Sequence, residues 1–322
     1  MTEYIPRPEG YQVNIDLEAA FERGLIAQFE ANRRNDEEAP HVSDLGQCGL
    51  AVSLRRSGAE QLPKDTRTLQ LMQKGLHDEE YVVGMLAAGL AGDGWRIIRS
   101  GVLADGLDLV GHLDVEIARM CCDHNNWADL DVFGWSCNCG PIRTAYDDLE
   151  GIFPEPVEYA YIEVKTTQWH ERWEHLGEIG KRGLPIKTKV LPGPRPEPSV
   201  AHRLQALGYV LRRLHPGQKK PMPYAIFQHD RALNGFKQYP KAGEWYDPAD
   251  AEWLARHDRA LEIVALTAPG IDPVEAGLAT INADGQLEGK APEEWMHSYC
   301  NYFQCALNTN KLNPKHAVEV PF

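Results

Sequence analysis

The arrangement of strand-like segments is the sequence feature that most constrains the fold. Two segments, WRIIRSGVLA (95–104) and LDLVGHLDVEIA (107–118), are rich in aliphatic and β-branched residues. The Asp105-Gly106 pair between them is typical of a tight hairpin turn. A third segment, VEYAYIEVKTT (157–167), resumes the strand pattern after an irregular stretch. Three strands therefore follow one another in the middle of the chain.

Helical segments surround these strands. Apolar residues recur at helical spacing, and the helices that we expect cover 16–34, 43–58, 66–90, 199–214 and 247–267. Ser43, Ser199 and Asp247 are predicted to cap three of these helices, with Pro248 in the first helical position after Asp247.

Three more segments follow the third strand. A short helix is expected near 168–180, and a loop over 181–198 because that stretch holds four prolines. PYAIFQHD (223–230) reads as a fourth strand. This order of elements predicts an α/β fold in which helices flank a small mixed β-sheet.

The chain length of 322 residues suits one domain, 1–322, built from several parts. The predicted parts are an N-terminal helical part (1–94), a central core (95–240) with a Cys-rich insertion (119–156), and a C-terminal helical part (241–322). The opening MTEYIPRPEG lacks a basic-then-apolar pattern, and no apolar run reaches the ~18 residues of a membrane helix. We therefore expect a cytoplasmic protein without a membrane segment.

Charge is unevenly distributed along the chain. The net charge of -14 disfavours a general nucleic-acid binder, which must neutralise phosphates. Residues 181–220, however, hold ten basic side chains against one acid, Glu197. This stretch is interpreted as a local DNA-binding surface, with an ordinary solvated basic surface as the alternative.

Carboxylates and a lysine stand on the predicted strands. Asp114 lies in GHLDVEI, with Glu116 on the same face because side chains alternate along a strand. Glu163 and Lys165 in IEVKTT likewise share a face. Such groups are costly to bury unless they bind a metal or pair with one another. A hydrolytic metal site and a cross-strand ion pair are therefore both open interpretations.

These segments resemble the RecB-like branch of the PD-(D/E)xK nucleases. GHLD, EVK on the next strand, and Gln205 and Tyr209 in a Q-x-x-x-Y pattern occur in the family's order, and QKGLHDEEYV supplies a preceding histidine, His77. The chain departs from the family in lacking the proline before Asp114 and in having 48 residues between Asp114 and Glu163. The segment 119–156 is therefore expected to be an insertion in a restriction-endonuclease-like core.

The resemblance implies roles for individual residues. Asp114, Glu163, the carbonyl of Val164 and His77 would bind Mg²⁺ or Mn²⁺, while a helix-surface histidine is the alternative for His77. Lys165 would assist the attacking water.

Gln205 and Tyr209 would face the DNA or support the site. Trp169, Trp173 and Tyr209 are interpreted as candidates for base stacking, with packing in a core as the alternative.

Some relatives in this branch, including CRISPR-associated RecB-like exonucleases and phage exonucleases, hold an iron–sulfur cluster between an early helix and the C-terminus. Cys48, Cys300 and Cys305 match that pattern in outline, with His297 where a cysteine is expected. An iron–sulfur cluster with one histidine ligand, a zinc ion, and no metal at all remain open for these four residues.

The insertion carries a second cysteine group. Four cysteines and a histidine lie within 19 residues, namely Cys121, Cys122, His124, Cys137 and Cys139. They are interpreted as zinc ligands, although the spacings differ from the usual C-x₂-C, so free cysteines in a loop are the alternative. An odd total of seven cysteines argues against a disulfide framework.

The function implied by the resemblance is a metal-dependent DNA exonuclease acting on single-stranded or end-bearing DNA. Phage or mobile-element recombination or repair is the setting that fits the relatives. An endonuclease using the same residues, either restriction-like or junction-resolving, is the second hypothesis. A catalytically silent DNA-binding module on a nuclease scaffold is the third.

Overall fold

The computed structural model describes most of the chain. The described residues are 17–31, 39–62, 64–91, 93–103, 109–119, 158–167, 172–179, 185–190, 197–212, 220–230, 232, 235–292, 296–297 and 300–309.

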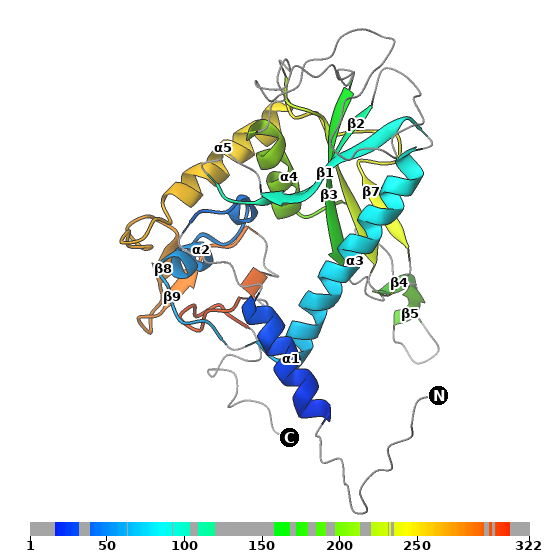
Figure 1. Cartoon of the computed structure of the whole chain (residues 1–322). Helices are drawn as coiled ribbons and strands as arrows, with labels where there is room; N and C mark the ends of the chain where they lie inside the picture. The colour runs from blue at the N-terminus through cyan, green and yellow to red at the C-terminus, as the bar shows by residue number, and fades with distance from the viewer. Residues whose placement is uncertain are drawn as a thin grey trace, which may run out of the picture.

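A five-stranded mixed sheet forms the centre of the protein (Figure 1). Its strands, in spatial order, are β1 (Trp95–Leu103), β2 (His112–Arg119), β3 (Glu158–Thr167), β6 (Tyr224–Asp230) and β7 (Phe236–Tyr239). β3 and β6 run parallel, and every other neighbouring pair in this sheet is antiparallel. The predicted α/β fold with a small mixed sheet is confirmed, as is the antiparallel pairing of the first two strands.

Helices cover both faces of the sheet (Figure 1). On one face, α3 (Thr66–Ala91) places Val82, Val83 and Leu86 against the buried aliphatic residues of β2 and β3. On the other face, α4 (Val200–Arg212) buries its Leu204, Leu207 and Val210 side against tyrosines of the sheet. The two helices therefore enclose β2 and β3 between separate apolar layers.

Helix α4 connects the two parallel strands β3 and β6, as a parallel pair requires a crossover. Its first turn is capped by Ser199, whose hydroxyl accepts a hydrogen bond from the amide of His202 at 3.2 Å. Gly208 lets the helix approach Val42 and Leu45 closely, since an added Cβ would lie 2.6 Å from the Leu45 side chain. The prediction of a Ser199-capped helix is confirmed.

The N-terminal region contains α1 (Leu17–Ala31), a 3-10 turn η1 (Val42–Asp44) and α2 (Gly49–Arg56). A continuous helix beginning at Ser43 was expected, and this prediction is wrong. Gly46 has φ +79°, a left-handed conformation that interrupts a helix, so α2 begins only after Cys48. The predicted long helix over 66–90 is confirmed by α3.

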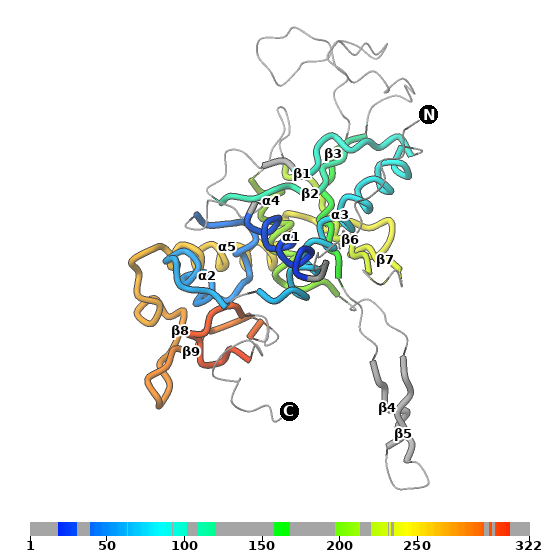
Figure 2. The backbone as a smooth tube through the Cα atoms, turned by 60° about the horizontal axis from the view of Figure 1, so that its bottom comes forward, coloured from blue at the N-terminus to red at the C-terminus, as the bar shows by residue number. Residues whose placement is uncertain are grey.

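The C-terminal region contains α5 (Ala251–Ala265) and a two-stranded sheet of β8 (Ala279–Ile281) and β9 (Leu287–Gly289). Helix α5 starts later than expected, because Asp250, rather than Asp247, accepts hydrogen bonds from the first helical amides. Asp247 instead closes the preceding turn through the amide of Ala249. Figure 2 shows α2 lying beside β8 and β9, so segments far apart in sequence meet here.

The segment after β3 differs from its predicted structure. The expected helix near 168–180 is wrong, as is the expected loop over 185–190, because β4 (Arg172–Ile179) and β5 (Pro185–Val190) form an antiparallel pair there. The alternating β-branched residues of PIKTKV suit a strand. Pro185 is the first residue of β5, a position where a missing N–H is tolerated.

Among the described residues, no helix combines the length and apolar character needed to cross a bilayer.

Candidate active site

The candidate site lies where β2 and β3 stop pairing. Their paired residues end at Val115 and Ile162, so the next residues of the two strands diverge. The Asp114 carboxylate bridges this opening, since its Oδ2 accepts a hydrogen bond from the Val164 amide at 2.9 Å. If the β2–β3 pairing continued, the backbone of β2 would accept the hydrogen bond of the Val164 amide. The Asp114 side chain accepts it instead.

Glu163 and Lys165 join Asp114 at this point. Glu163 is fully buried, and its Oε1 contacts the ammonium of Lys165. The same ammonium lies 3.6 Å from Oδ2 of Asp114. The structure therefore brings the predicted Asp114, Glu163 and Lys165 together.

Burial and mutual charge both shift the pKa values of Asp114, Glu163 and Lys165. Burial, aided by the charge of Asp114, raises the pKa of Glu163 to about 7. Burial also raises the pKa of Asp114. For Lys165, burial alone would lower the pKa, but the carboxylates of Glu163 and Asp114 outweigh it and raise the pKa above its ordinary value. Lys165 is thus a permanent cation beside acids that resist ionisation.

Tyr161 and Tyr209 support Glu163 from the α4 side. The Tyr161 hydroxyl donates a hydrogen bond to Glu163 Oε2, and the Asp114 amide donates to that hydroxyl at 3.4 Å. The Tyr161 and Tyr209 rings lie 5.6 Å apart. Gln205 bonds to the Tyr209 hydroxyl, so this predicted pair lines the site at the expected helical spacing. Gln205, Tyr209 and Tyr161 thus form a chain of contacts that ends at the Glu163 carboxylate.

Close packing against Tyr209 explains why the GHLD segment begins with a glycine, Gly111. A Cβ at this position would lie 2.5 Å from the Tyr209 hydroxyl oxygen and 2.9 Å from its ring. Only a glycine lets the chain entering β2 pass this close to the tyrosine. The residue three positions before Asp114 is therefore fixed by packing against α4.

Helix α3 contributes an acid that the sequence analysis missed. Glu79 lies one helical turn from both Gly75 and Val82, the buried residues on its face. Burial, followed by the charge of Asp114, raises the pKa of Glu79 to about 7, while Lys165 opposes the shift. Glu79 therefore shares the electrostatic environment of the site. The helical period of buried residues on α3 is the signal that would have found it.

His77, expected to be a metal ligand, lies elsewhere on α3. Its side chain is 72% exposed and its nearest acidic partner is Glu80, at 3.7 Å. Two residues along a helix correspond to a rotation of roughly 200°, which separates His77 from Glu79. The structure does not bring His77 to Asp114 and Glu163.

The residues present suit a divalent cation. Asp114, Glu163 and Glu79 supply hard carboxylate oxygens, which Mg²⁺ and Mn²⁺ prefer. Lys165 contacts Asp114 and Glu163, and His112 also favours the charged form of Asp114. Among the described residues, no three histidine, cysteine or acidic side chains are already gathered closely enough to ligate one ion. Binding would therefore require these side chains to rotate toward each other.

The basic stretch is only partly described. Arg203 is stacked between Tyr246 and Trp253, with its guanidinium 3.9 and 3.8 Å from their ring centres, and lies 3.6 Å from Asp250. Arg212 lies 2.9 Å from a ring nitrogen of the buried His257. These two arginines therefore serve the packing of α4 against α5.

Lys220 is exposed. The remaining basic side chains of this stretch lie outside the residues whose side chains are described, as do Trp169 and Trp173.

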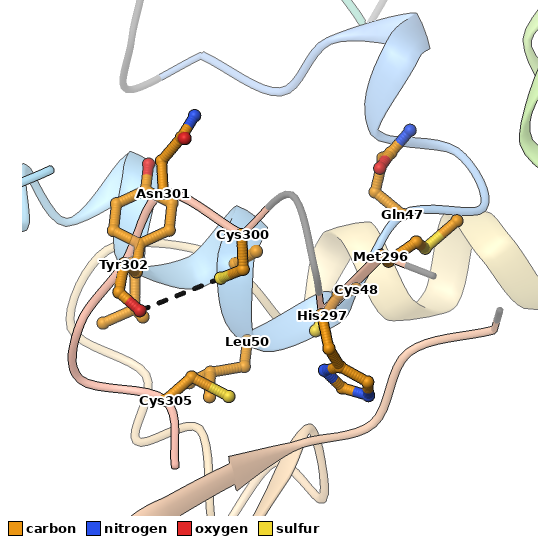
Figure 3. A pocket seen from close by; sticks show the side chains of 11 residues that line it. Gln47, Cys48, Leu50, Met296, His297, Cys300, Asn301, Tyr302 and Cys305 are labelled. Atoms are coloured by element: carbon orange, nitrogen blue, oxygen red, sulfur yellow. Dashed lines mark hydrogen bonds between the residues drawn. The ribbon is translucent and has the colours of Figure 1, made fainter. Parts of the chain in front are cut away.

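A second site gathers the predicted C-terminal cysteines with Cys48. Cys48, His297, Cys300 and Cys305 line one cavity of about 160 Å³, and Figure 3 shows the Cys300 thiol turned toward the Tyr302 carbonyl, to which it donates at 3.8 Å. Burial raises the pKa of Cys300 to about 11, with added contributions from Cys305 and Cys48. Gly289 of β9 gives Cys48 room, since a Cβ there would lie 3.0 Å from the Cys48 sulfur. The fold thus brings a residue from before α2 together with residues from after β9.

The second cysteine group, Cys121, Cys122, His124, Cys137 and Cys139, lies outside the described residues.

Searches of protein-family models, curated proteins and solved structures find no significant match to this chain. The chemistry of the two sites is therefore interpreted from their own residues.

Proposed function

We propose that this protein is a metal-dependent deoxyribonuclease with the RecB-like PD-(D/E)xK arrangement. The observation that carries the proposal is the contact of Lys165 with both Asp114 and the fully buried Glu163, at the point where β2 and β3 diverge. Two strand carboxylates and the nearby Glu79 meet at this point, and carboxylate oxygens are the ligands that hard divalent cations prefer, which favours a site for such a cation.

Each residue has a distinct task in this proposal. Asp114 and Glu163, with the carbonyl of Val164 and the carboxylate of Glu79, would hold Mg²⁺ or Mn²⁺. Such an ion lowers the pKa of bound water and offsets charge on the phosphate. Lys165, kept protonated by its acidic neighbours, donates hydrogen bonds to a phosphate oxygen and stabilises its negative charge. Tyr161 orients Glu163 by donating to Oε2.

Exonuclease action on single-stranded or end-bearing DNA, in recombination or repair, is the activity we favour. The test is digestion of end-labelled linear and closed circular single-stranded DNA with Mn²⁺, comparing the wild type with Lys165→Ala. Shortening of the linear strand, survival of the circle and an inactive variant would support the exonuclease. Cleavage of the circle would show an endonuclease that uses the same residues.

The third hypothesis, a catalytically silent DNA-binding module, predicts that neither DNA substrate is cleaved. If a folded, Mn²⁺-loaded wild type cuts neither substrate, the nuclease proposal fails and the module becomes the better account. Retention of Asp114, Glu163 and Lys165 in mutual contact favours catalysis over that module.

We also propose a structural metal in the cavity lined by Cys48, His297, Cys300 and Cys305. Three thiols and an imidazole line one cavity, and zinc and iron–sulfur clusters both take sulfur and nitrogen ligands. Binding would require the four side chains to turn toward one another. Elemental analysis of protein purified without oxygen distinguishes the two, because a cluster carries iron and sulfide. Metal absent from folded protein would remove this proposal and leave the nuclease proposal standing.

A further inference from the structure

Three residues form a row across the sheet beside the candidate site. Lys165 of β3 is paired with Gln228 of β6, and Gln228 is paired with Lys237 of β7. Side chains of directly paired residues in neighbouring strands point to the same face. The row therefore leads from the proposed catalytic lysine to a second lysine on the outermost strand, β7.

The row is held by contacts on the same face. The Lys237 ammonium lies 4.6 Å above the centre of the Tyr239 ring. The Tyr239 hydroxyl in turn donates to the buried Gln228 side chain at 3.3 Å. Lys237 is thus kept close to the sheet instead of extending into solvent. Two strand spacings of about 4.8 Å separate it from Lys165, which gives roughly 10 Å between the two backbones.

An exposed aromatic ring lies next to Lys237 on the same strand. Phe236 is 71% exposed, the largest exposed fraction among the large hydrophobic side chains of the described residues. One face of its ring is stacked on Phe227 at 5.6 Å with an interplanar angle of 22°. Because neighbours along a strand face opposite sides, β7 offers a cation on one side of the sheet edge and an aromatic ring on the other.

We propose that the β7 edge binds the single-stranded part of the nucleic-acid substrate next to the cleaved bond. Lys237 contacts a phosphate, and Phe236 stacks on an unpaired base as the strand crosses the sheet edge. This proposal rests on the proposed nuclease function and specifies its substrate as a strand with unpaired bases.

Charge and spacing both favour this occupant. The separation of roughly 10 Å is short enough for nearby phosphates of one strand to contact Lys165 and Lys237. Stacking on an aromatic ring tolerates any base, but the base must be unpaired to present its face. A paired duplex would leave Phe236 without a partner, so binding of blunt duplex should not depend on this ring.

The test measures binding of a fluorescein-labelled 12-nucleotide single strand, and of a blunt duplex, in Ca²⁺ to suppress cleavage. The variants are Phe236→Ala, Lys237→Gln and the control Lys241→Gln. Lys241 is exposed and pairs with Glu244 outside the row, which makes it a matched lysine. Thermal melts verify that all three variants fold.

Phe236→Ala is expected to weaken single-strand binding by about fivefold or more, the lower end of one base stack, and to leave duplex binding unchanged. Lys237→Gln is expected to lower the slope of log affinity against log salt by about 0.7, one phosphate on a single strand. Lys241→Gln should match the wild type in both.

Equal single-strand binding by all three variants and the wild type would overturn the β7 proposal. That result would leave the nuclease proposal intact if the wild type cuts DNA. Weaker binding by Phe236→Ala in a protein that cuts no DNA would support the β7 edge and reject the nuclease.

Discussion

Lys165 lies between the fully buried carboxylate of Glu163 and the part-buried carboxylate of Asp114. Burial, followed by the charge of Asp114, raises the pKa values of Glu163 and Glu79 to about 7. Protons can neutralise these carboxylates at low pH, and a divalent cation can offset their charge at higher pH. The chemistry of these residues therefore links metal binding, pH and stability.

The first prediction concerns that link. A carboxyl whose folded pKa exceeds its unfolded value stabilises the fold fully below the unfolded pKa, near 4.5, and loses that contribution as pH rises through about 7. We expect the melting temperature of chelator-treated protein to fall between pH 5 and pH 8, less steeply in Glu163→Gln. Added Mn²⁺ should raise it more at pH 8 than at pH 5.5. An equal Mn²⁺ shift at both pH values would contradict this.

The second prediction asks which residue of α3, Glu79 or His77, contributes to Mn²⁺ binding. Glu79 shares its environment with Asp114 and Lys165, whereas His77 is exposed beside Glu80. We expect Glu79→Gln to weaken Mn²⁺ binding, measured by calorimetry, by about 10-fold or more, the scale of support around a metal ligand. His77→Ala should bind Mn²⁺ like the wild type. Weaker Mn²⁺ binding by His77→Ala, with wild-type binding by Glu79→Gln, would show that His77 is the ligand instead.

At the scale of elements, the position of α4 against the start of β2 determines the shape of the site. Tyr209 of α4 reaches Gly111 so closely that no side chain fits between them. The same tyrosine lies beside Tyr161, which bonds to Glu163. The packing of the helix and the position of the carboxylate are thus coupled.

The third prediction tests this coupling. Gly111→Ala should lower the free energy of unfolding by about 1–3 kcal/mol, the usual cost of overpacking, as measured by urea denaturation. Tyr209→Phe removes the hydroxyl that would lie 2.5 Å from the new Cβ, so the double variant should recover part of the loss. If the losses in unfolding free energy for Gly111→Ala and Tyr209→Phe simply add in the double variant, the contact between the two residues does not cause the destabilisation.

Much of the core could be predicted from the sequence, because the signals there are local. Alternation of residues in 112–119 and 158–167 determines which side chains share a face, so Asp114, Glu163 and Lys165 were identified correctly as neighbours. Glu79 was missed because a histidine two positions earlier matched a family pattern. The face of α3 that is buried depends on packing that the pattern does not contain.

Other errors have similarly physical origins. Prolines in 181–198 suggested a loop, although Pro185 can begin a strand without losing a needed N–H. The DNA-binding interpretation of 181–220 stays a prediction, although Arg203 is enclosed by Tyr246 and Trp253. Such tertiary contacts leave no local signal in the sequence.

At the scale of the whole molecule, the cysteine cavity joins the N-terminal and C-terminal regions. Cys48 precedes α2, and Cys300 and Cys305 follow β9. Closing a loop of this length is entropically costly, so a metal bound only by the folded state would add to stability.

The fourth prediction follows from that arrangement. Cys300→Ser should lower the melting temperature by several degrees and reduce the bound metal, while cleavage per folded molecule stays near the wild-type rate. Metal analysis, thermal melts and cleavage assays below the melting point measure these three effects. An unchanged melting temperature would count against a metal in the cavity.

The most direct test of the central claim compares two buried glutamates of the same sheet. Glu163 and Glu116 are both fully buried, and of these two glutamates Glu163 is the one that forms an ion pair with Lys165. We would measure Mn²⁺-dependent cleavage of end-labelled single-stranded DNA by the wild type, Glu163→Gln and Glu116→Gln, normalised to folded protein. The account predicts a loss of about 100-fold or more for Glu163→Gln and near-normal cleavage for Glu116→Gln. Cleavage retained by Glu163→Gln would contradict it.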